Sequence, residues 1–219
     1  MARVFVIRGR LCLFFAADCR RDCKKDIGAP PNPMVKIIID FDDTLFNTAS
    51  LKEDLLELFA RFGVSTEKFW ETYKISYTQN GLASYNLWRH IDIVCQQFPN
   101  LDKKLMLAGA KEILSNNKKY LTDGAEDFLN ELSKFGIPLI LLSSGDAEWQ
   151  KEKVDSVGVA NFFQEVIFTG HNKKEAIQPL IKDAIGDIIF INDKIKETQE
   201  VAAISGQIKP ILRVKKGIS

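Results

Sequence analysis

The sequence predicts an α/β fold, in which a parallel β-sheet is covered by helices on both faces and carries an inserted helical module. Short runs of apolar and β-branched residues recur along the chain, and helical segments separate most of them. This alternation is typical of βα units, whose strands are buried on both faces. Between residues 50 and about 120, helical spacing continues without a strand pattern, which predicts the inserted module.

The first strand is predicted at residues 35–39, a short and mostly apolar run that ends at Asp40-Phe-Asp42-Asp-Thr44. In the module that follows, apolar residues fall at helical spacing. They are Leu51, Leu55, Leu58 and Phe59, and then Leu87, Ile91, Val94 and Cys95. Because Gly63, Asn80-Gly81 and Pro99-Asn100 suit breaks between helices, the module is predicted to hold about four of them.

Helix and strand then alternate to the end of the chain. Helices are predicted at residues 124–135, 147–157, 173 to about 184, and 195–204. Strands are predicted at residues 137–142, 166–168, 188–191 and 208–212, and Gly136 suits the end of the first of these helices. Since a helix links each strand to the next, the sheet is predicted to be parallel.

Composition narrows the class of protein. The chain has 219 residues, which suits one sizeable α/β domain or a core with a smaller inserted module. The formal net charge is +1, so there is no strong overall charge to indicate a nucleic-acid or membrane partner. No apolar stretch of the sequence is long enough to cross a membrane. The 4 cysteines do not form a disulfide framework at this length, so a reducing, cytoplasmic location is expected.

Residues 1–33 differ from the rest of the chain. They are rich in basic residues, and a short apolar run lies among them. A targeting segment would need a longer run and a cleavage site, and a metal pair at Cys19 and Cys23 would need two further ligands. We therefore interpret residues 1–33 as a poorly packed extension that ends in a linker, Gly28-Ala-Pro-Pro-Asn-Pro33.

Polar side chains recur where the predicted strands end. Asp40 and Asp42 follow the first strand, Ser143, Ser144 and Gly145 follow the second, and Asn192 and Asp193 follow the fourth. Lys173 and Lys174 begin the helix after the third strand. Ligands of open parallel sheets bind at this edge, so carboxylates, a hydroxyl and a cation are predicted to converge there.

This set of groups suits phosphoryl transfer. Carboxylates that lie close together repel each other unless a cation neutralises them, and Mg²⁺ favours carboxylate oxygens and often bridges to a phosphate. One carboxylate can attack phosphorus, and a second one two residues on can protonate the leaving oxygen and then activate water. A serine hydroxyl, backbone N–H groups and a lysine can hold the phosphoryl oxygens.

The segment Ile37-Ile-Ile-Asp40-Phe-Asp42-Asp-Thr44-Leu resembles the first motif of the haloacid dehalogenase-like hydrolases, and the resemblance extends from residue 34 to about 214. It implies a Rossmann-like core at 34–48 and 121–219, with a helical C1-type cap at 49–120. By this resemblance Asp40 is the nucleophile and a Mg²⁺ ligand. Asp42 is the general acid–base, and its backbone carbonyl also binds Mg²⁺.

The later motifs are similar to those of the family but depart from it in places. Leu139-Ile-Leu-Leu-Ser143-Ser-Gly resembles the second motif and implies that Ser143 contacts the phosphoryl group, with Ser144 and Gly145 beside it. Ile188-Ile-Phe-Ile-Asn-Asp193 resembles the fourth, which implies that Asp193 binds Mg²⁺, with Glu197 at the second acidic position. The third-motif lysine is assigned to Lys173, although no proline follows it and Lys174 is an alternative.

The sequence thus favours a Mg²⁺-dependent phosphatase that hydrolyses a small phosphorylated metabolite through an aspartyl-phosphate. Phe46 and Asn47, in the flap after Asp42, are expected to contact substrate beneath the cap. Within the cap, Trp88 is expected to pack, and Arg89 and His90 to be solvated. A phosphomutase would use the same groups, and a non-catalytic binding domain is the alternative outside enzymes. The sequence does not determine the oligomeric state.

Overall fold

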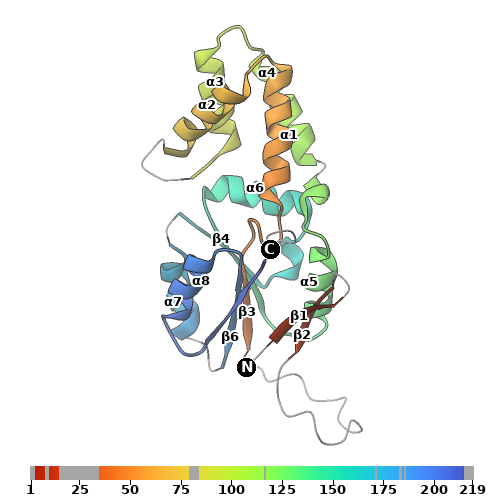
Figure 1. The fold of residues 1–219 in the computed structure, drawn as a ribbon, viewed down its shortest axis with the longest axis vertical. Coiled ribbons are helices and arrows are strands. Elements are labelled where there is room, and N and C mark those ends of the chain that lie inside the picture. The colour runs from red at the N-terminus through yellow and green to blue at the C-terminus, as the bar shows by residue number, and fades with distance from the viewer. Residues whose placement is uncertain are drawn as a thin grey trace, which may run out of the picture.

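The chain folds as an α/β sheet structure with a helical insertion above it, as seen in a computed structural model (Figure 1). The structure describes residues 3–7, 10–14, 35–78, 84–115, 117–170, 172–182, 184 and 186–214, with the backbone alone at 3–7, 10–14 and 117. The predicted fold class is confirmed: one sheet has five strands, all parallel to their neighbours.

The order of the strands in the sheet is β5-β4-β3-β6-β7. The strands are β3 (Lys36–Ile39), β4 (Leu139–Ser144), β5 (Glu165–Thr169), β6 (Ile188–Asn192) and β7 (Ile208–Leu212). The chain proceeds outward from β3 on one side through β4 and on the other through β6. Such a reversal of strand order opens a crevice at the carboxyl end of the central strand, which here carries Asp40.

Alternating residues of each strand bury different faces of the sheet. Ile38 and Phe190 pack with Ile177 and Val201 on the face covered by α7 (Lys173–Lys182) and α8 (Ile195–Ala202). Ile37 packs on the opposite face, which α5 (Ala125–Ser133) and α6 (Ala147–Val157) cover. Both faces of β3 are therefore buried. This explains why its sequence is a continuous apolar run and not an alternation of apolar and polar residues.

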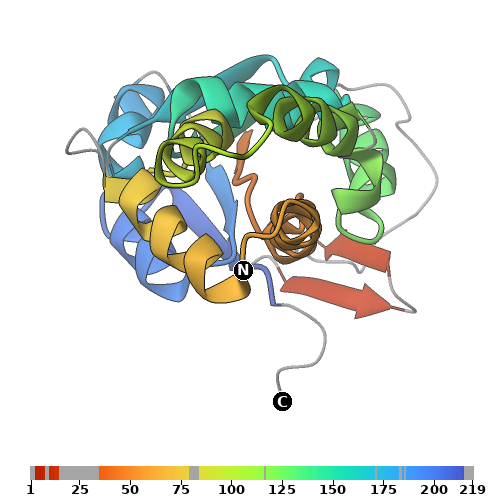
Figure 2. The ribbon, with the colours of Figure 1, turned by 90° about the horizontal axis from the view of Figure 1, so that it is seen from above.

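The insertion between β3 and β4 contains four helices among its described residues, as the sequence predicted. They are α1 (Thr48–Arg61), α2 (Thr66–Thr78), α3 (Leu87–Gln97) and α4 (Lys103–Ser115), and the short η2 (Asn117–Tyr120) follows them. Seen from above, α1 is viewed nearly along its axis, and strands of the sheet are visible below the insertion (Figure 2). The predicted break at Gly63 is confirmed, with φ at 80°, whereas Asn80-Gly81 lies outside the described residues.

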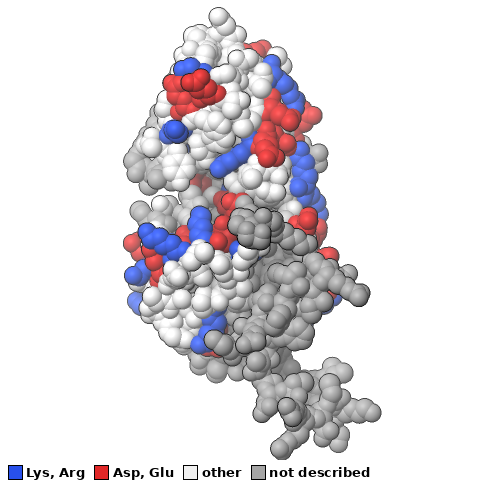
Figure 3. Space-filling view, in the orientation of Figure 1, with Lys and Arg blue, Asp and Glu red and all other residues white. Residues whose placement is uncertain are grey.

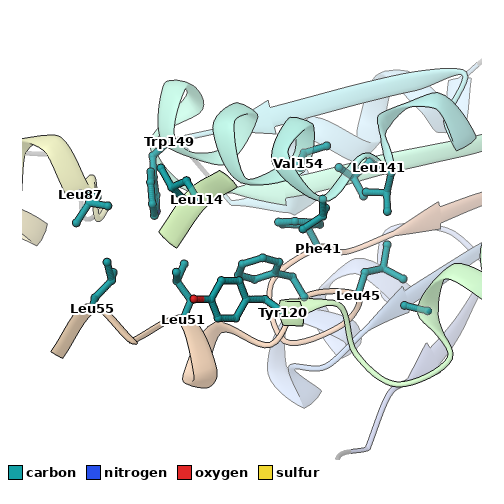
Figure 4. Packing of buried hydrophobic residues seen from close by; sticks show 14 of the residues in the cluster. Phe41, Leu45, Leu51, Leu55, Leu87, Leu114, Tyr120, Leu141, Trp149 and Val154 are labelled. Atoms are coloured by element: carbon teal, nitrogen blue, oxygen red, sulfur yellow. The ribbon is translucent and has the colours of Figure 1, made fainter. Parts of the chain in front are cut away.

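One hydrophobic cluster joins the insertion to the sheet. In Figure 4, Leu55 and Leu87 of the insertion lie at one end of it and Leu141 of the sheet lies at the other, with Tyr120 and Trp149 between them. All five side chains are buried. The insertion is therefore held against the sheet by apolar burial as well as by its two chain connections.

The amino-terminal segment corrects the sequence analysis in part. Strands β1 (Arg3–Ile7) and β2 (Arg10–Phe14) pair as an antiparallel hairpin, in which Arg3 is opposite Phe14 and Ile7 is opposite Arg10. This two-stranded sheet is separate from the five-stranded one, and no strand was predicted there. Cys19, Cys23 and the predicted linker lie outside the described residues. Among the described helices, none is both long and apolar enough to cross a membrane.

Candidate active site

The predicted polar residues meet at the carboxyl edge of the sheet. Asp40 follows β3, Ser143 and Ser144 end β4, and Asn192 ends β6 beside Asp193. Lys173 is the first residue of α7, which begins after β5. Because parallel strands end at one edge, residues more than a hundred positions apart come within hydrogen-bond distance of each other.

Asp40 is buried, with 2% of its surface exposed. Its Oδ1 accepts a hydrogen bond from Lys173 Nζ at 2.6 Å, and its Oδ2 accepts one from Thr44 Oγ1 at 3.0 Å. Burial raises the pKa of Asp40 to about 6, against the lowering effect of Lys173, and the charges of Asp42 and Asp193 raise it further. The carboxylate thus lies where an additional cation would be favoured.

Lys173 is the lysine at the site, and Lys174 is exposed. Besides Asp40, Lys173 Nζ donates to Glu197 Oε2 at 2.8 Å and to Asn192 Oδ1 at 3.2 Å. Burial lowers the pKa of Lys173, but the two carboxylates outweigh it and raise that pKa above its usual value. The ammonium therefore stays charged beside the candidate nucleophile.

The Asp42 side chain is held from the side of α6 and α1. Lys153 Nζ and Thr48 Oγ1 donate to Oδ1, the latter at 3.0 Å, and Gln150 Nε2 donates to Oδ2 at 2.8 Å. Burial raises the pKa of Asp42, but the charge and hydrogen bond of Lys153, with those of Gln150 and Thr48, lower it overall. The carboxylate is thus ionised and oriented, with 23% of its side chain exposed.

Lys153 was missed by the sequence analysis. Its side chain is only 3% exposed, and its Nζ lies 5.6 Å from the ring centroid of Phe41, 5.3 Å from that of Phe46 and 5.9 Å from that of Trp149. These aromatic faces and Asp42 compensate a buried cation. A signal was present, because Lys153 falls four residues after Trp149 on the apolar face of its helix.

Ser143 and Ser144 take up different positions at the end of β4. Ser143 is fully buried, and its Oγ has no hydrogen-bond partner among the described residues. Ser144 is partly exposed, and its carbonyl accepts a hydrogen bond from Gln150 Nε2 at 3.1 Å. A buried hydroxyl without a partner is costly and suits a ligand that would supply one, so the Ser143 position fits a phosphoryl oxygen.

The N–H of Gly145 is bonded within the sheet, so a contact of Gly145 with substrate would not use this group. That N–H donates to the Thr169 carbonyl at 2.9 Å and so closes β4 against β5. The residue has φ at 146°, and a Cβ there would lie 2.6 Å from Gln150 Nε2. Glycine is therefore required for the backbone turn and for the approach of the side chain that holds Asp42.

Phe46 and Asn47 both have structural roles in the flap, and a contact with substrate stays a prediction for Asn47, which is partly exposed. Phe46 is completely buried and stacks on Phe41 with 5.0 Å between the ring centroids, so a ligand cannot reach its ring. Asn47 is the N-cap of α1: its Oδ1 accepts from Ser50 N at 3.3 Å, and its Nδ2 donates to Ser50 Oγ at 2.8 Å. Both residues shape the flap and the start of the insertion.

The residues expected to hold Mg²⁺ are only partly free to do so. Asp193 Oδ1 is buried without a hydrogen-bond partner in the described part of the chain, whereas Glu197 Oε2 already binds Lys173 and Asn192 Nδ2, the latter at 2.9 Å. The described residues contain no cluster of three or more His, Cys, Asp or Glu side chains suited to a metal. Mg²⁺ keeps several waters and needs only one or two carboxylates, so Asp40 and Asp193 fit it.

The polar residues of the insertion are less solvated than predicted. His90 is fully buried, with its Nε2 2.8 Å from Thr72 Oγ1 and its Nδ1 3.1 Å from the Tyr85 hydroxyl. Arg89 is partly buried and donates from Nε to the Ser76 carbonyl at 2.9 Å. Trp88 packs against the hydrophobic cluster as expected. Burial lowers the pKa of His90 to about 4, so this residue is neutral in the folded protein.

Solved structures with the same fold include different hydrolases. A provisionally assigned haloacid dehalogenase-like hydrolase from Burkholderia xenovorans LB400 matches with a TM-score of 0.65 and 18% identity, over 81% of each chain. An L-2-haloacid dehalogenase matches with a TM-score of 0.55 and 15% identity, over 86% of this chain and 89% of its own. A provisionally assigned phosphatase from Clostridium difficile matches with a TM-score of 0.50 and 15% identity, over 83% and 85%.

Sequence comparison identifies the family. No curated protein matches the chain as a relative. The sequence model of the haloacid dehalogenase-like hydrolases, however, matches residues 37–202, which include β3 with Asp40, the insertion, Lys173 and Asp193. The chain therefore belongs to the haloacid dehalogenase-like hydrolase family.

Proposed function

We propose that this protein is a Mg²⁺-dependent phosphatase that hydrolyses a small phosphate monoester through an aspartyl-phosphate on Asp40. The observation that carries the proposal is the arrangement around Asp40. The buried carboxylate of Asp40 accepts a hydrogen bond from the buried ammonium of Lys173. Asp42, two residues later, accepts one from a different lysine, Lys153. A structural ion pair alone would not need the second pair beside it.

The first half of the reaction assigns a role to each carboxylate. A carboxylate oxygen of Asp40 attacks phosphorus, and the bond from phosphorus to the leaving oxygen breaks. Asp42, which is ionised in the protein without substrate, must first take up a proton; it then gives that proton to the leaving oxygen, so an alcohol departs. In this proposal Lys173 and the Ser143 hydroxyl bind phosphoryl oxygens, with Ser144 beside them; the bond from Lys173 to Asp40 and the unpartnered Ser143 Oγ support these roles.

The second half releases phosphate. Asp42, now a carboxylate, takes a proton from water, and the water oxygen attacks phosphorus. The bond from phosphorus to Asp40 breaks, which leaves inorganic phosphate and both side chains as they began. The hydrogen bonds from Gln150 and Thr48 keep Asp42 oriented through both halves. A phosphomutase would use the same groups and replace water by a second hydroxyl of the substrate.

The carboxylates of Asp40 and Asp193 and the backbone carbonyl of Asp42 would hold Mg²⁺. When bound, Mg²⁺ neutralises carboxylate and phosphoryl charge. Glu197 is proposed as a further ligand, although its hydrogen bond to Lys173 supports a role in orienting that lysine. Residues 49–120 are proposed to act as a C1-type cap that excludes water and selects a small, soluble metabolite in the cytoplasm.

Asp42 favours phosphoryl transfer over dehalogenation within the family. A halide leaves without a proton, so a dehalogenase does not need a general acid there, whereas an alkoxide leaving group does. Here the carboxylate is present and is held by three side chains. The three hydrogen bonds that orient the Asp42 carboxylate support its role in proton transfer.

A panel of small phosphate esters, assayed for phosphate release, tests the proposal. Turnover is expected to need Mg²⁺ and to stop in excess chelator. Asp40→Asn should abolish turnover and keep the circular dichroism of the folded protein. Lys173→Ala is expected to lower kcat by about 100-fold or more, and Lys174→Ala, its exposed neighbour, should lie within about twofold of the parent. Full activity of Asp40→Asn, or equal activity in chelator, would refute the mechanism.

A further inference from the structure

Helix α2 presents a stripe of aromatic side chains next to the candidate site. Trp70, Tyr73 and Tyr77, called the aromatic stripe below, follow each other at helical spacing. The centroid of the Tyr73 ring lies 5.4 Å from that of Trp70 and 6.3 Å from that of Tyr77. Trp70 is 37% exposed and Tyr77 39% exposed, so large apolar rings remain in contact with water.

Only Tyr73 of the aromatic stripe packs against the rest of the insertion, where its ring meets Tyr85 and His90; Trp70 and Tyr77 remain exposed. The buried residues of α2 are Phe69, Thr72 and Ser76, which occupy a neighbouring face of the helix. Phe69 packs edge-on against Phe59 with 5.0 Å between the centroids, and Thr72 Oγ1 bonds His90. The core of the insertion therefore does not depend on the exposed rings of the stripe.

A chain of contacts through Tyr85, Trp149 and Lys153 leads from the aromatic stripe to Asp42. Tyr73 stacks on Tyr85 at 4.5 Å and 22°. Tyr85 meets Trp149 edge-on at 6.0 Å, and Trp149 lies beside Lys153, which holds Asp42. Burial is the main cause that raises the pKa of Tyr73 to about 12, followed by the charges of Tyr77 and Asp42, so Asp42 lies within electrostatic reach of its hydroxyl.

The surroundings of the stripe suit a ligand that is both flat and anionic. Lys52 of α1 places its Nζ 5.4 Å from the centroid of the Tyr73 ring, which adds a cation near the stripe. A phosphate ester whose ring lies along the stripe would have its phosphate directed to the sheet edge, where Lys173 adds a second positive charge.

We propose that the aromatic stripe binds the leaving group of the substrate, so that the preferred substrates are phosphate monoesters of alcohols that carry a flat aromatic ring. The inference rests on the proposed function and names its substrate class. The ring stacks on the exposed Tyr77 and contacts the edge of Tyr73, whose faces meet Tyr85 and Lys52, while the phosphate is directed to Asp40. Stacking of this kind favours an aromatic ring over a saturated one by about tenfold.

Two esters of matched size and charge test the inference. Benzyl phosphate and cyclohexylmethyl phosphate differ in the flatness of the ring, and kcat/KM is expected to favour the benzyl ester by about tenfold. Tyr77→Leu should reduce the preference to about twofold or less, whereas Tyr77→Phe should keep it. Ile75→Ala is the matched control, because Ile75 lies on the same helix with the same 39% exposure but off the stripe. Equal kcat/KM for both esters would overturn the inference.

Binding to the parent protein separates this inference from the proposed function. Benzylphosphonate and cyclohexylmethylphosphonate have no ester bond to hydrolyse, and calorimetry should show about tenfold tighter binding of the benzyl compound. If no ester is turned over but this preference is found, the phosphatase mechanism fails and the aromatic site stands. If esters are turned over and the two phosphonates bind equally or not at all, the inference fails and the phosphatase stands.

Discussion

Lys153 and Asp42 form an ion pair at the boundary between a dry core and the site. The lysine side chain is 3% exposed and that of the aspartate 23%. Removing one partner of a buried pair leaves an uncompensated charge, which is more damaging than the pair is stabilising. At the residue scale, stability and site geometry are therefore coupled through one contact.

Replacing Lys153 should reveal this coupling. Lys153→Met keeps the apolar stem but leaves Asp42 without its cation, and we expect the free energy of unfolding to fall by about 2 kcal/mol. Lys151→Met is the control, because Lys151 is 66% exposed and pairs with Asp155 on the surface of the same helix. That change should cost less than about 1 kcal/mol. Urea denaturation measures both, and equal losses would contradict the expectation.

His90 should make stability depend on pH in a defined direction. Burial lowers its pKa from 6.5 to about 4, so the unfolded chain binds a proton before the folded protein does. Its contribution is present above pH 6.5 and is lost as pH falls toward 4, which amounts to about 2 kcal/mol between pH 7.5 and pH 5. The mechanism is desolvation, since the ring is completely buried.

Comparison with His90→Gln isolates this effect. Asp40, whose pKa is raised to about 6, titrates in the same range with the opposite sign, because protonation relieves a buried carboxylate. Asp40 contributes equally in both proteins, so the difference between their unfolding free energies reports on His90. That difference should shrink or reverse by about 2 kcal/mol from pH 7.5 to pH 5. A difference independent of pH would show that His90 is not buried in its neutral form.

Helix α6 connects the insertion to the sheet at the element scale. Asp146, its N-cap, accepts through Oδ1 from Trp149 N and from Asn86 Nδ2, each at 3.0 Å, and pairs through Oδ2 with Arg89 at 3.6 Å. Trp88 Nε1 adds a hydrogen bond to Glu152 at 2.7 Å. Helix α3 is thus fastened to the helix that also carries Gln150 and Lys153.

Two substitutions of Asp146 should distinguish the stability that comes from capping α6 from the stability that comes from the charge of the carboxylate. Asp146→Ala removes the N-cap and leaves Asn86 and Arg89 without their partner, so we expect a loss of about 2 kcal/mol in the free energy of unfolding. Asp146→Asn keeps an acceptor for Trp149 N and Asn86, and it should lose less than about 1 kcal/mol. Thermal and urea unfolding provide the measurement. A larger loss in the Asn variant would instead assign the stability to the ion pair with Arg89.

Secondary structure was largely predictable, because it depends on short-range patterns. All five strands of the parallel sheet and helices α5 to α8 were placed from apolar periodicity to within a few residues, whereas the helices of the insertion were predicted in number and not in their bounds. Strand β4 begins at Leu139 rather than at residue 137, since Pro138 precedes it and offers only its carbonyl, to Ile37 N. The β1–β2 hairpin was missed, although two five-residue runs around Arg8-Gly9 carry a hairpin pattern.

On the scale of the whole molecule, one of the two hydrophobic clusters joins the sheet to the insertion, and the surface carries charges of both signs. The cluster of Figure 4 continues from the sheet into the insertion, and on the face shown in Figure 3 basic and acidic residues are interspersed. The candidate site lies where the sheet and the insertion meet. A ligand bound there should therefore stabilise the whole fold rather than one part of it.

Mg²⁺ should raise the unfolding temperature if Asp193 helps to hold it. At a concentration of about 100 times Kd, binding adds about 2.7 kcal/mol to the free energy of unfolding. Asp193→Asn should remove most of this response. Asp187→Asn is the control, because Asp187 precedes the same strand at the opposite edge of the sheet and pairs with Lys209 on the surface. An unchanged response in Asp193→Asn would remove Asp193 from the proposed ligands.

The sequence by itself determined the fold class and predicted that Asp40 and a lysine converge at one edge of the sheet. These follow from local periodicity and from the rule that parallel strands end together. It could not show that Gly145 donates to β5 or that Phe46 is buried, because both depend on which neighbour packs against the turn or ring.

Only the tertiary structure decided what holds Asp42 and which lysine reaches Asp40. Lys153 lies 111 residues from Asp42, and Lys173 lies 133 residues from Asp40. Lys173 and Lys174 are adjacent, so local pattern alone separates them weakly, whereas α7 buries one and exposes the other. A buried charge is stable only beside its partners, and those partners meet only when the sheet and helices are packed.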